Sequence, residues 1–344
     1  MSEQKGLTGL ANLGNTCFIN SCIQVLSHTN ELNSFLDGDY KGKLSAYRDK
    51  KYLVDSRLVI EYDKLRRLMW SQNCKISPVA FLRSIQQTAR QKGKDIFTGY
   101  AQNDLPEFLL FIIDTFHNGL HREVEMNIKG SIKNKQDEMA TKCLKMYMNM
   151  YSKEYSEILE LFYAIHVSKI KKISSDEVLS VTPEPFFIMD IPLPENKNEL
   201  TLIECIDLYC NGEVLEGENG WYNEKTKEKE DVVKKISFWN LPKILVIDLK
   251  RFTFNGKKRQ NPIDLELDNL DLSKYVDGYD KESYVYELYG VCNHSGGTLG
   301  GHYTSLVRAK DRKWYLFNDT EVKEVGFDGK NNSSGYCLFY RKKY

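Results

Sequence analysis

The sequence lacks an excess of charge of either sign. Its 344 residues contain 48 Lys and Arg against 48 Asp and Glu, so the formal net charge is zero. Proteins that bind nucleic acid through its phosphates carry a basic face, and a balanced chain shows no such footprint. The composition therefore argues against a nucleic-acid partner and leaves only local charged patches for binding.

Long apolar runs are also absent. No segment approaches the about 18 consecutive apolar residues that a membrane helix needs. Residues 1–16 are polar and rich in glycine, without the apolar core of a signal peptide. We therefore expect a cytoplasmic or nuclear protein with no membrane partner, and we expect a monomer.

The eight cysteines lack the spacing of a structural zinc site. They stand at positions 17, 22, 74, 143, 205, 210, 292 and 337, and none of them forms a Cys-x-x-Cys pair. In a reducing compartment such cysteines remain free thiols. The sequence thus predicts no disulfide, no metal and no cofactor. Hydrophobic residues make up 41% of the chain and aromatic residues 12%, which is enough for a sizeable core.

Helical periodicity fills the first half of the chain. Apolar residues recur three and four positions apart in five segments, namely 16–36, 57–70, 77–90, 102–117 and about 139–163. Thr16 stands where a helix N-cap is expected. A polar stretch over 121–138 interrupts this pattern, and we expect it to form a surface loop.

The second half changes to short runs of β-branched and aromatic residues separated by Gly, Pro and Asn. These runs, which read as strands, are PFFIMDIPL, ILVIDLKRFTF, YVYELYGVCNH, HYTSLVRAK, KWYLFND and YCLFYRKK. Residues 216–231 are highly charged and indicate a solvated loop or hairpin tip. Helices first and strands later predict an α+β fold.

Cys17 is the first candidate for chemistry. It stands at the expected start of the 16–36 helix, where unpaired N–H groups and the helix dipole stabilise a thiolate. Gly14 lets the preceding loop turn sharply, and the amide of Asn12 could donate to an oxyanion. The alternative is a buried core cysteine, which is the interpretation we favour for Cys22 on the apolar stripe of the same helix.

A cysteine nucleophile needs a base and a group that orients the base. His294 and His302 lie in the glycine-rich stretch VCNHSGGTLGGHYTSLV, and His302 opens a strand. Asn318 and Asp319 end the next strand, and either could fix the imidazole tautomer. A cysteine on a helix followed by His and Asn or Asp on strands is a papain-like order, which leaves a cysteine hydrolase and a set of unrelated residues both open.

Several longer blocks resemble the ubiquitin-specific protease family. GLTGLANLGNTCFINSCIQVLSH resembles its cysteine box, and HSGGTLGGHYTSLVRAKDRKWYLFNDTEVKEV resembles its histidine box. YAQNDLPEFLLFIID is similar to the Gln-Gln-Asp block, LPKILVIDLKRF to a palm strand and SGYCLFYRKK to the closing strand. The blocks occur in the family's order and extend over nearly the whole chain.

The resemblance implies a catalytic role for five residues. Cys17 is expected to attack the carbonyl at the end of ubiquitin's Gly-Gly tail, and His302 to act as general base and then as acid. Asn318 matches the third triad position, Asp319 an adjacent acid that shares the orienting role, and Asn12 the oxyanion-hole position.

The resemblance also implies the fold and the substrate channel. The expected fold is α+β and papain-like, a single domain over 1–344 with a helical thumb (1–160), β fingers (161–240) and a β palm (241–344). Asp104 matches an acidic contact for the arginine-containing ubiquitin tail. The residues that match the walls of the narrow channel are His294, Gly301 and Tyr303.

Two features depart from the family pattern. Family fingers often carry zinc on two Cys-x-x-Cys pairs, but here one pair aligns with Asn223 and Thr226, and the other falls near 169–177, which has no cysteine. We therefore expect fingers without metal. Pro106 stands in the middle block and requires a helix that begins there.

The implied activity is that of a deubiquitinating thiol hydrolase acting on ubiquitin and ubiquitinated proteins. Two alternatives remain open at this point, a catalytically weak ubiquitin-binding module and a protease for another ubiquitin-like modifier.

Overall fold

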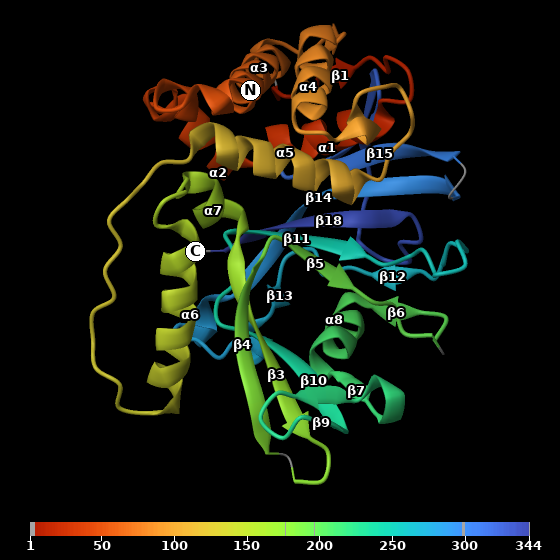
Figure 1. Ribbon diagram of the computed structural model, residues 1–344. Coiled ribbons are helices and arrows are strands. Elements are labelled where there is room, and N and C mark those ends of the chain that lie inside the picture. The colour runs from red at the N-terminus through yellow and green to blue at the C-terminus, as the bar shows by residue number, and fades with distance from the viewer. Residues whose placement is uncertain (1–3, 176, 196, 298–299, 344) are drawn as a thin grey trace.

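The computed structural model describes residues 4–175, 177–195, 197–297 and 300–343. The helices within residues 17–120 gather at one end, a broad sheet occupies the middle, and a narrower sheet projects at the other end (Figure 1). The helices within 135–151 and 202–211 lie beside that narrower sheet. The helices are α1 (Cys17–Ser27), α2 (Asn30–Asp37), α3 (Leu53–Ser71), α4 (Val79–Gln91), α5 (Leu105–Leu120), α6 (Lys135–Tyr151), α7 (Glu157–Phe162) and α8 (Leu202–Asn211).

The segment 16–36 contains two helices where the periodicity predicts one. The N–H of His28 donates to the carbonyl of Val25 (3.0 Å) and that of Thr29 to the carbonyl of Leu26 (3.1 Å), so short i to i+3 bonds close α1. Residues of α1 and α2 enter the same core, so the apolar pattern continues across the break. The predicted helix over about 139–163 is likewise divided, into α6 and α7.

α5 begins where Pro106 requires. Asp104 is the N-cap, and its Oδ1 accepts a hydrogen bond from the N–H of Glu107 (3.2 Å). Pro106 follows in the first turn, where the missing N–H breaks no intrahelical bond.

The palm is built on an eight-stranded sheet with the order β17-β16-β15-β14-β18-β11-β5, and β13 also pairs with β14. Neighbouring strands are antiparallel except for β11 and β5, which are parallel. Its strands are β5 (Ile188–Ile191), β11 (Ile244–Leu249), β13 (Leu270–Asp271), β14 (Val285–Gly297), β15 (Gly300–Arg308), β16 (Trp314–Asn318), β17 (Glu321–Val325) and β18 (Gly335–Lys342).

The fingers contain a four-stranded sheet with the order β4-β3-β10-β7 and a separate hairpin of β8 and β9. The strands are β3 (Ala164–Lys172), β4 (Val178–Phe186), β7 (Glu213–Leu215), β8 (Trp221–Asn223), β9 (Glu228–Glu230) and β10 (Val232–Phe238). β5 lies within 161–240 but pairs with β11 of the palm, so the chain enters the palm sheet between two finger strands.

α1 is packed directly against the palm sheet, and all of its residues are buried. A Cβ added to Gly290 of β14 would lie 2.4 Å from a methyl of Val25, so only glycine permits this approach. The hydroxyl of Ser21 donates to the carbonyl of Thr304 in β15 (2.8 Å). This contact brings the start of α1 beside β15.

Two large hydrophobic clusters lie on the two faces of the palm sheet. Ile244 and Val246 of β11 enter the cluster under the thumb helices, whereas Leu245 and Ile247 enter the cluster that includes α8. The fold is therefore α+β, as the element order predicts. Within the described residues, no helix has both the length and the apolar character to cross a bilayer.

Candidate active site

Cys17 is the first residue of α1, and its side chain is buried. The loop before it turns through Gly14 and Asn15, which have φ values of +105° and +52°. Thr16 occupies the N-cap position, but its hydroxyl accepts a hydrogen bond from the N–H of Leu13 (2.9 Å) and does not cap the helix. The first turn of α1 therefore keeps backbone N–H groups without intrahelical acceptors around Cys17.

His302 lies on β15 and is held by Asn318. Its Nε2 is 2.6 Å from Oδ1 of Asn318, at the end of β16. Because an amide oxygen only accepts, Nε2 carries the hydrogen and the neutral imidazole keeps Nδ1 as an acceptor. The backbone of Tyr303, the residue after His302, lies close enough to the Cys17 thiol to lower its pKa. His302 and Asn318 are thus held together on neighbouring strands, and α1, which Cys17 opens, packs against the strand of His302.

No hydrogen bond in the described part of the chain joins the Cys17 thiol to His302. Such bonds are often long in a substrate-free enzyme and shorten when substrate binds.

Asp319 does not bond to His302 in this structure. Its Oδ2 accepts from Nδ2 of Asn12 (3.0 Å) and its Oδ1 from Nδ2 of Asn20 (2.8 Å). The residue adopts a φ of +49°, and its carbonyl accepts from the N–H of Leu10 (2.8 Å). The structure therefore gives Asp319 no direct contact with His302, because its carboxylate is directed at Asn12 and Asn20.

Burial raises the pKa of Cys17, and this opposes the expected effect of the helix start. Loss of solvation is the largest cause, and the charge of Asp319 acts in the same direction. Hydrogen bonds from the backbone of Tyr303, Phe18 and Cys17 itself lower the pKa by less. The thiol is therefore the favoured form in the substrate-free protein, and proton transfer to His302 must accompany attack.

The raised pKa of Cys17 predicts how its thiol reacts with iodoacetamide when no substrate is bound. Only the thiolate reacts, so a raised pKa leaves little reactive species near neutrality, and the rate should climb steadily from about pH 6 to about pH 9. Mass spectrometry of the Cys17 peptide checks this, with the partly exposed Cys74 as an internal reference. A rate already constant below pH 7 would contradict it.

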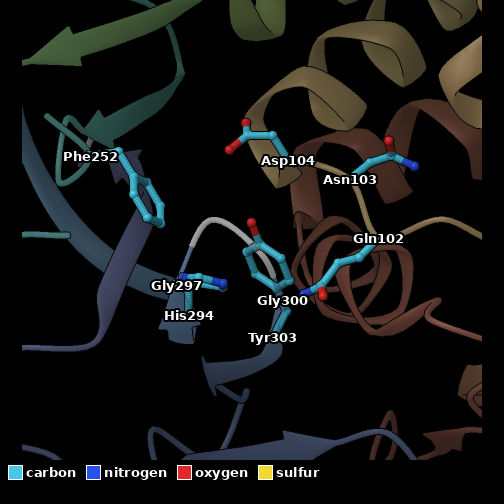
Figure 2. A pocket seen from close by; sticks show the side chains of 8 residues that line it. All are labelled: Gln102, Asn103, Asp104, Phe252, His294, Gly297, Gly300 and Tyr303. Carbon is cyan, nitrogen blue, oxygen red and sulfur yellow. The ribbon is translucent and has the colours of Figure 1, made fainter. Parts of the chain in front are cut away.

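A cavity of about 350 Å³ lies between the thumb and the glycine-rich β14–β15 hairpin. Figure 2 shows the thumb residues facing the side chains of His294 and Tyr303, with Phe252 at one edge. The cavity is lined by Gln102, Asn103, Asp104, Phe252, His294, Gly297, Gly300 and Tyr303. Three of the residues predicted to contact a bound tail, Asp104, His294 and Tyr303, therefore share one cavity.

Gly301 is fixed between the thumb and His294. Gln102 donates from Nε2 to the carbonyl of Gly301 (2.7 Å) and accepts at Oε1 from its N–H (2.9 Å), as a neighbouring strand would. A Cβ at this position would lie 2.3 Å from Nε2 of His294 and 2.4 Å from the carbonyl oxygen of Ser295. No side chain fits there without displacing the channel wall.

The two carboxylate oxygens of Asp104 accept hydrogen bonds from two different elements. One oxygen caps α5, and the other accepts a hydrogen bond from the hydroxyl of Tyr336 in β18 (2.6 Å). This bond links the thumb to the palm at the cavity. Because the carboxylate still lines the cavity, it remains available to a cationic group of a ligand.

A family model described as ubiquitin carboxyl-terminal hydrolase matches residues 8–340. The chain belongs to the ubiquitin carboxyl-terminal hydrolase family. Among family members, Ubiquitin carboxyl-terminal hydrolase Usp2 of Drosophila melanogaster is 32% identical over 346 residues, which are 99% of this chain and 35% of the relative. Ubiquitin carboxyl-terminal hydrolase 2 of Homo sapiens is 34% identical over 349 residues, 98% of this chain and 55% of the relative. The chain thus spans between about a third and about half of these two relatives.

A solved member with the same fold is the SAGA Ubp8/Sgf11/Sus1/Sgf73 DUB module bound to ubiquitin aldehyde. The alignment has a TM-score of 0.73 and 22% identity, and it covers 100% of this chain and 71% of that chain. The papain-like α+β fold expected from the sequence is therefore confirmed.

The fingers of the present chain do not offer a zinc site at the positions where the resemblance places one. Nδ2 of Asn223 and the hydroxyl of Thr226 both donate to Oε1 of Glu230, at 2.6 Å and 3.2 Å. An amide and a hydroxyl bound to one carboxylate do not make the thiolate set that tetrahedral zinc requires. Asp176, in the segment 169–177, lies outside the described residues. Among the described residues, neither this segment nor any other part of the chain brings together three or more His, Cys, Asp or Glu that could hold a metal ion.

Two residues of the site carry roles that the sequence reasoning did not assign. Gln102 lies within the block resembling the Gln-Gln-Asp motif, but only the folded hairpin shows its paired bonds to Gly301. Asn20 is a buried amide one turn after Cys17, and its Nδ2 donates to Asp319. In the sequence Asn20 stands among the other polar residues of α1, Ser21 and Gln24, and only the fold shows that it is buried.

Proposed function

We propose that this chain is a cysteine-type deubiquitinase. It hydrolyses the peptide or isopeptide bond after the C-terminal glycine of ubiquitin through Cys17, His302 and Asn318, with Asn12 as an oxyanion donor. The observation that carries the proposal is the 2.6 Å bond from Nε2 of His302 to Asn318, which leaves Nδ1 as the acceptor on the strand that α1 packs against.

The reaction follows from this arrangement. Nδ1 of His302 takes the proton of the Cys17 thiol as the sulfur attacks the carbonyl carbon of the terminal glycine. The tetrahedral oxyanion accepts hydrogen bonds from the N–H of Cys17 and the amide of Asn12. His302 then gives its proton to the departing lysine amine, which leaves a thioester on Cys17. Water attacks the thioester with His302 as base, the C–S bond breaks, and the ubiquitin carboxylate leaves as the Cys17 thiol is restored.

Asp319 supports this chemistry as a positioning residue for Asn12. Its carboxylate takes one hydrogen of the Asn12 amide, while Oδ1 of Asn12 accepts from the N–H groups of Gly14 and Thr16 (both 3.1 Å). The amide plane is thereby fixed at both ends. The second amide hydrogen of Asn12 is left for an oxyanion beside the start of α1.

The cavity supports ubiquitin as the substrate. Gly301 approaches His294 too closely to carry a side chain into the cavity wall, and Asp104 offers a carboxylate to an arginine-containing tail. The SAGA DUB module of the same fold is a ubiquitin complex by its description. We further propose that the protein works as a monomer in the cytoplasm or nucleus, where its eight free thiols persist.

The test is covalent labelling with ubiquitin that carries a C-terminal electrophile. The wild-type protein should form a stoichiometric adduct at Cys17, and the Cys17→Ala variant should form none while still binding ubiquitin. The same electrophile on other ubiquitin-like modifiers, run in parallel, reports selectivity. Ubiquitin binding without an adduct would identify a binding module, and an adduct only with another modifier would identify a different protease.

A further inference from the structure

The ammonium group of Lys258 contacts both the ring and the backbone of His294. Its Nζ lies 3.1 Å from Nδ1 of His294 and also donates to the carbonyl oxygen of the same residue. Lys258 is half-buried, and its Nζ lies 6.0 Å from the ring centroid of Phe252; within the described residues no carboxylate forms an ion pair with it. Placing an unpaired ammonium group there costs free energy, which suggests that the contact with His294 serves the cavity.

The ammonium group determines which nitrogen of His294 carries hydrogen. A lysine ammonium has three donors and no acceptor, so Nδ1 must be the acceptor of this bond. In the neutral imidazole the hydrogen then sits on Nε2. Burial, and secondly the charge of Lys258, lower the pKa of His294 to about 4, so the ring is neutral at physiological pH.

Nε2 of His294 lies on the Gly301 side of the ring, in a residue that lines the cavity. It lies near the α-carbon of Gly301, and within the described residues no hydrogen bond uses it. The ring is held by Phe252, Tyr303 and Tyr336, whose centroids are 5.7, 4.6 and 5.7 Å away. Because these aromatic rings fix the plane, the N–H keeps one direction, and it has no acceptor among the described residues.

We propose that Lys258 is a positioning residue that holds His294 as a neutral Nε2–H donor for a main-chain carbonyl oxygen of the extended tail in the cavity. This inference rests on the proposed function for the identity of the tail. A carbonyl oxygen is the acceptor that an extended glycine-rich chain presents to such a donor. Asp104, across the cavity, recognises cationic groups and leaves this role to His294.

The first test compares Lys258→Met with Lys257→Met. Both changes remove one positive charge from the same loop, but Lys257 is exposed and does not contact His294. Loss of one well-oriented hydrogen bond should raise KM for a ubiquitin C-terminal amide about five- to tenfold in Lys258→Met, with kcat within about twofold. Lys257→Met should leave both values unchanged. Equal effects of the two variants, or a loss confined to kcat, would overturn the proposal.

The second test reads the tautomer directly. In protein labelled with ¹⁵N-histidine, the His294 nitrogens of the wild type should show Nε2 protonated and Nδ1 unprotonated at neutral pH. Lys258→Met should shift this resonance pair toward the Nδ1–H form. An unchanged tautomer in that variant, or a changed tautomer without a change in KM, would overturn the proposal.

A double-mutant cycle separates positioning from folding defects. In a His294→Phe background, Lys258→Met should have no further effect on KM, because its only proposed target is gone. A full additional loss there would show that Lys258 acts elsewhere. If ubiquitin electrophiles fail to label the wild type at all, the proposed function falls, whereas the tautomer measurement still decides the role of Lys258 without substrate.

Discussion

In the His302→Ala variant, kcat for a ubiquitin C-terminal amide is expected to fall about 10³-fold, the scale of a lost general base. No other imidazole stands on β15 beside the start of α1 to replace it. The pKa of Cys17 is raised by burial, so without a proton acceptor the thiol stays protonated and nucleophilic attack is slow. Single-turnover kinetics with saturating enzyme measures the chemical step.

Asn318→Ala provides the contrast. The imidazole keeps Nδ1 as a base and loses only the 2.6 Å bond that fixes its tautomer and plane. A single neutral hydrogen bond contributes ~1 kcal/mol, so kcat should fall only about five- to tenfold. Asp319 cannot take over this role without releasing Asn12 and Asn20. Equal losses in His302→Ala and Asn318→Ala would show that the two roles are assigned wrongly.

Gly301→Ala is expected to lower kcat/KM about 100-fold, since displacement of a site by about an ångström has consequences of that order. The added methyl group would overlap Nε2 of His294 and the carbonyl of Ser295, and neither can retreat easily. His294 is locked by Lys258 and three aromatic rings, and Ser295 is a β14 backbone position paired with His302.

A matched substitution isolates the steric effect. Gly326 has no neighbouring atom within 4 Å of an added Cβ, so Gly326→Ala should retain wild-type kinetics. Thermal unfolding of both variants separates loss of the channel from loss of the fold. Wild-type kcat/KM in Gly301→Ala would mean that the hairpin relaxes freely and that the contact between Gly301 and His294 does not shape the cavity for its substrate.

Element type was predictable from periodicity, whereas breaks between elements were not. The apolar pattern identified helical segments at 16–36 and about 139–163, yet both divide into two helices. The pattern reports which residues face the core, and consecutive helices that pack on one core continue it across a bend. Conversely, Pro106 marks the start of α5 because proline acts locally on the backbone.

In the candidate active site, too, the sequence predicted the residues but not the contacts between them. Residue types and chain order pointed to Cys17, His302 and the pair at 318–319, but the order could not choose between Asn318 and Asp319. The positive φ of Asp319 turns its carboxylate from β15 toward Asn12 and Asn20, a choice made by backbone geometry. The helix start at Cys17 similarly favoured a low pKa, and burial reversed the direction.

By itself, the sequence determined the fold class, the family and the residues able to do chemistry, because these depend on residue type, order and periodicity. Tertiary structure alone decided which polar atoms meet: Gln102 with Gly301, Lys258 with His294, and Asp319 with Asn12. The physical reason is that a hydrogen bond or a desolvated thiol depends on separations of a few ångströms between residues up to 307 positions apart. Local patterns in the chain carry no information about such distances.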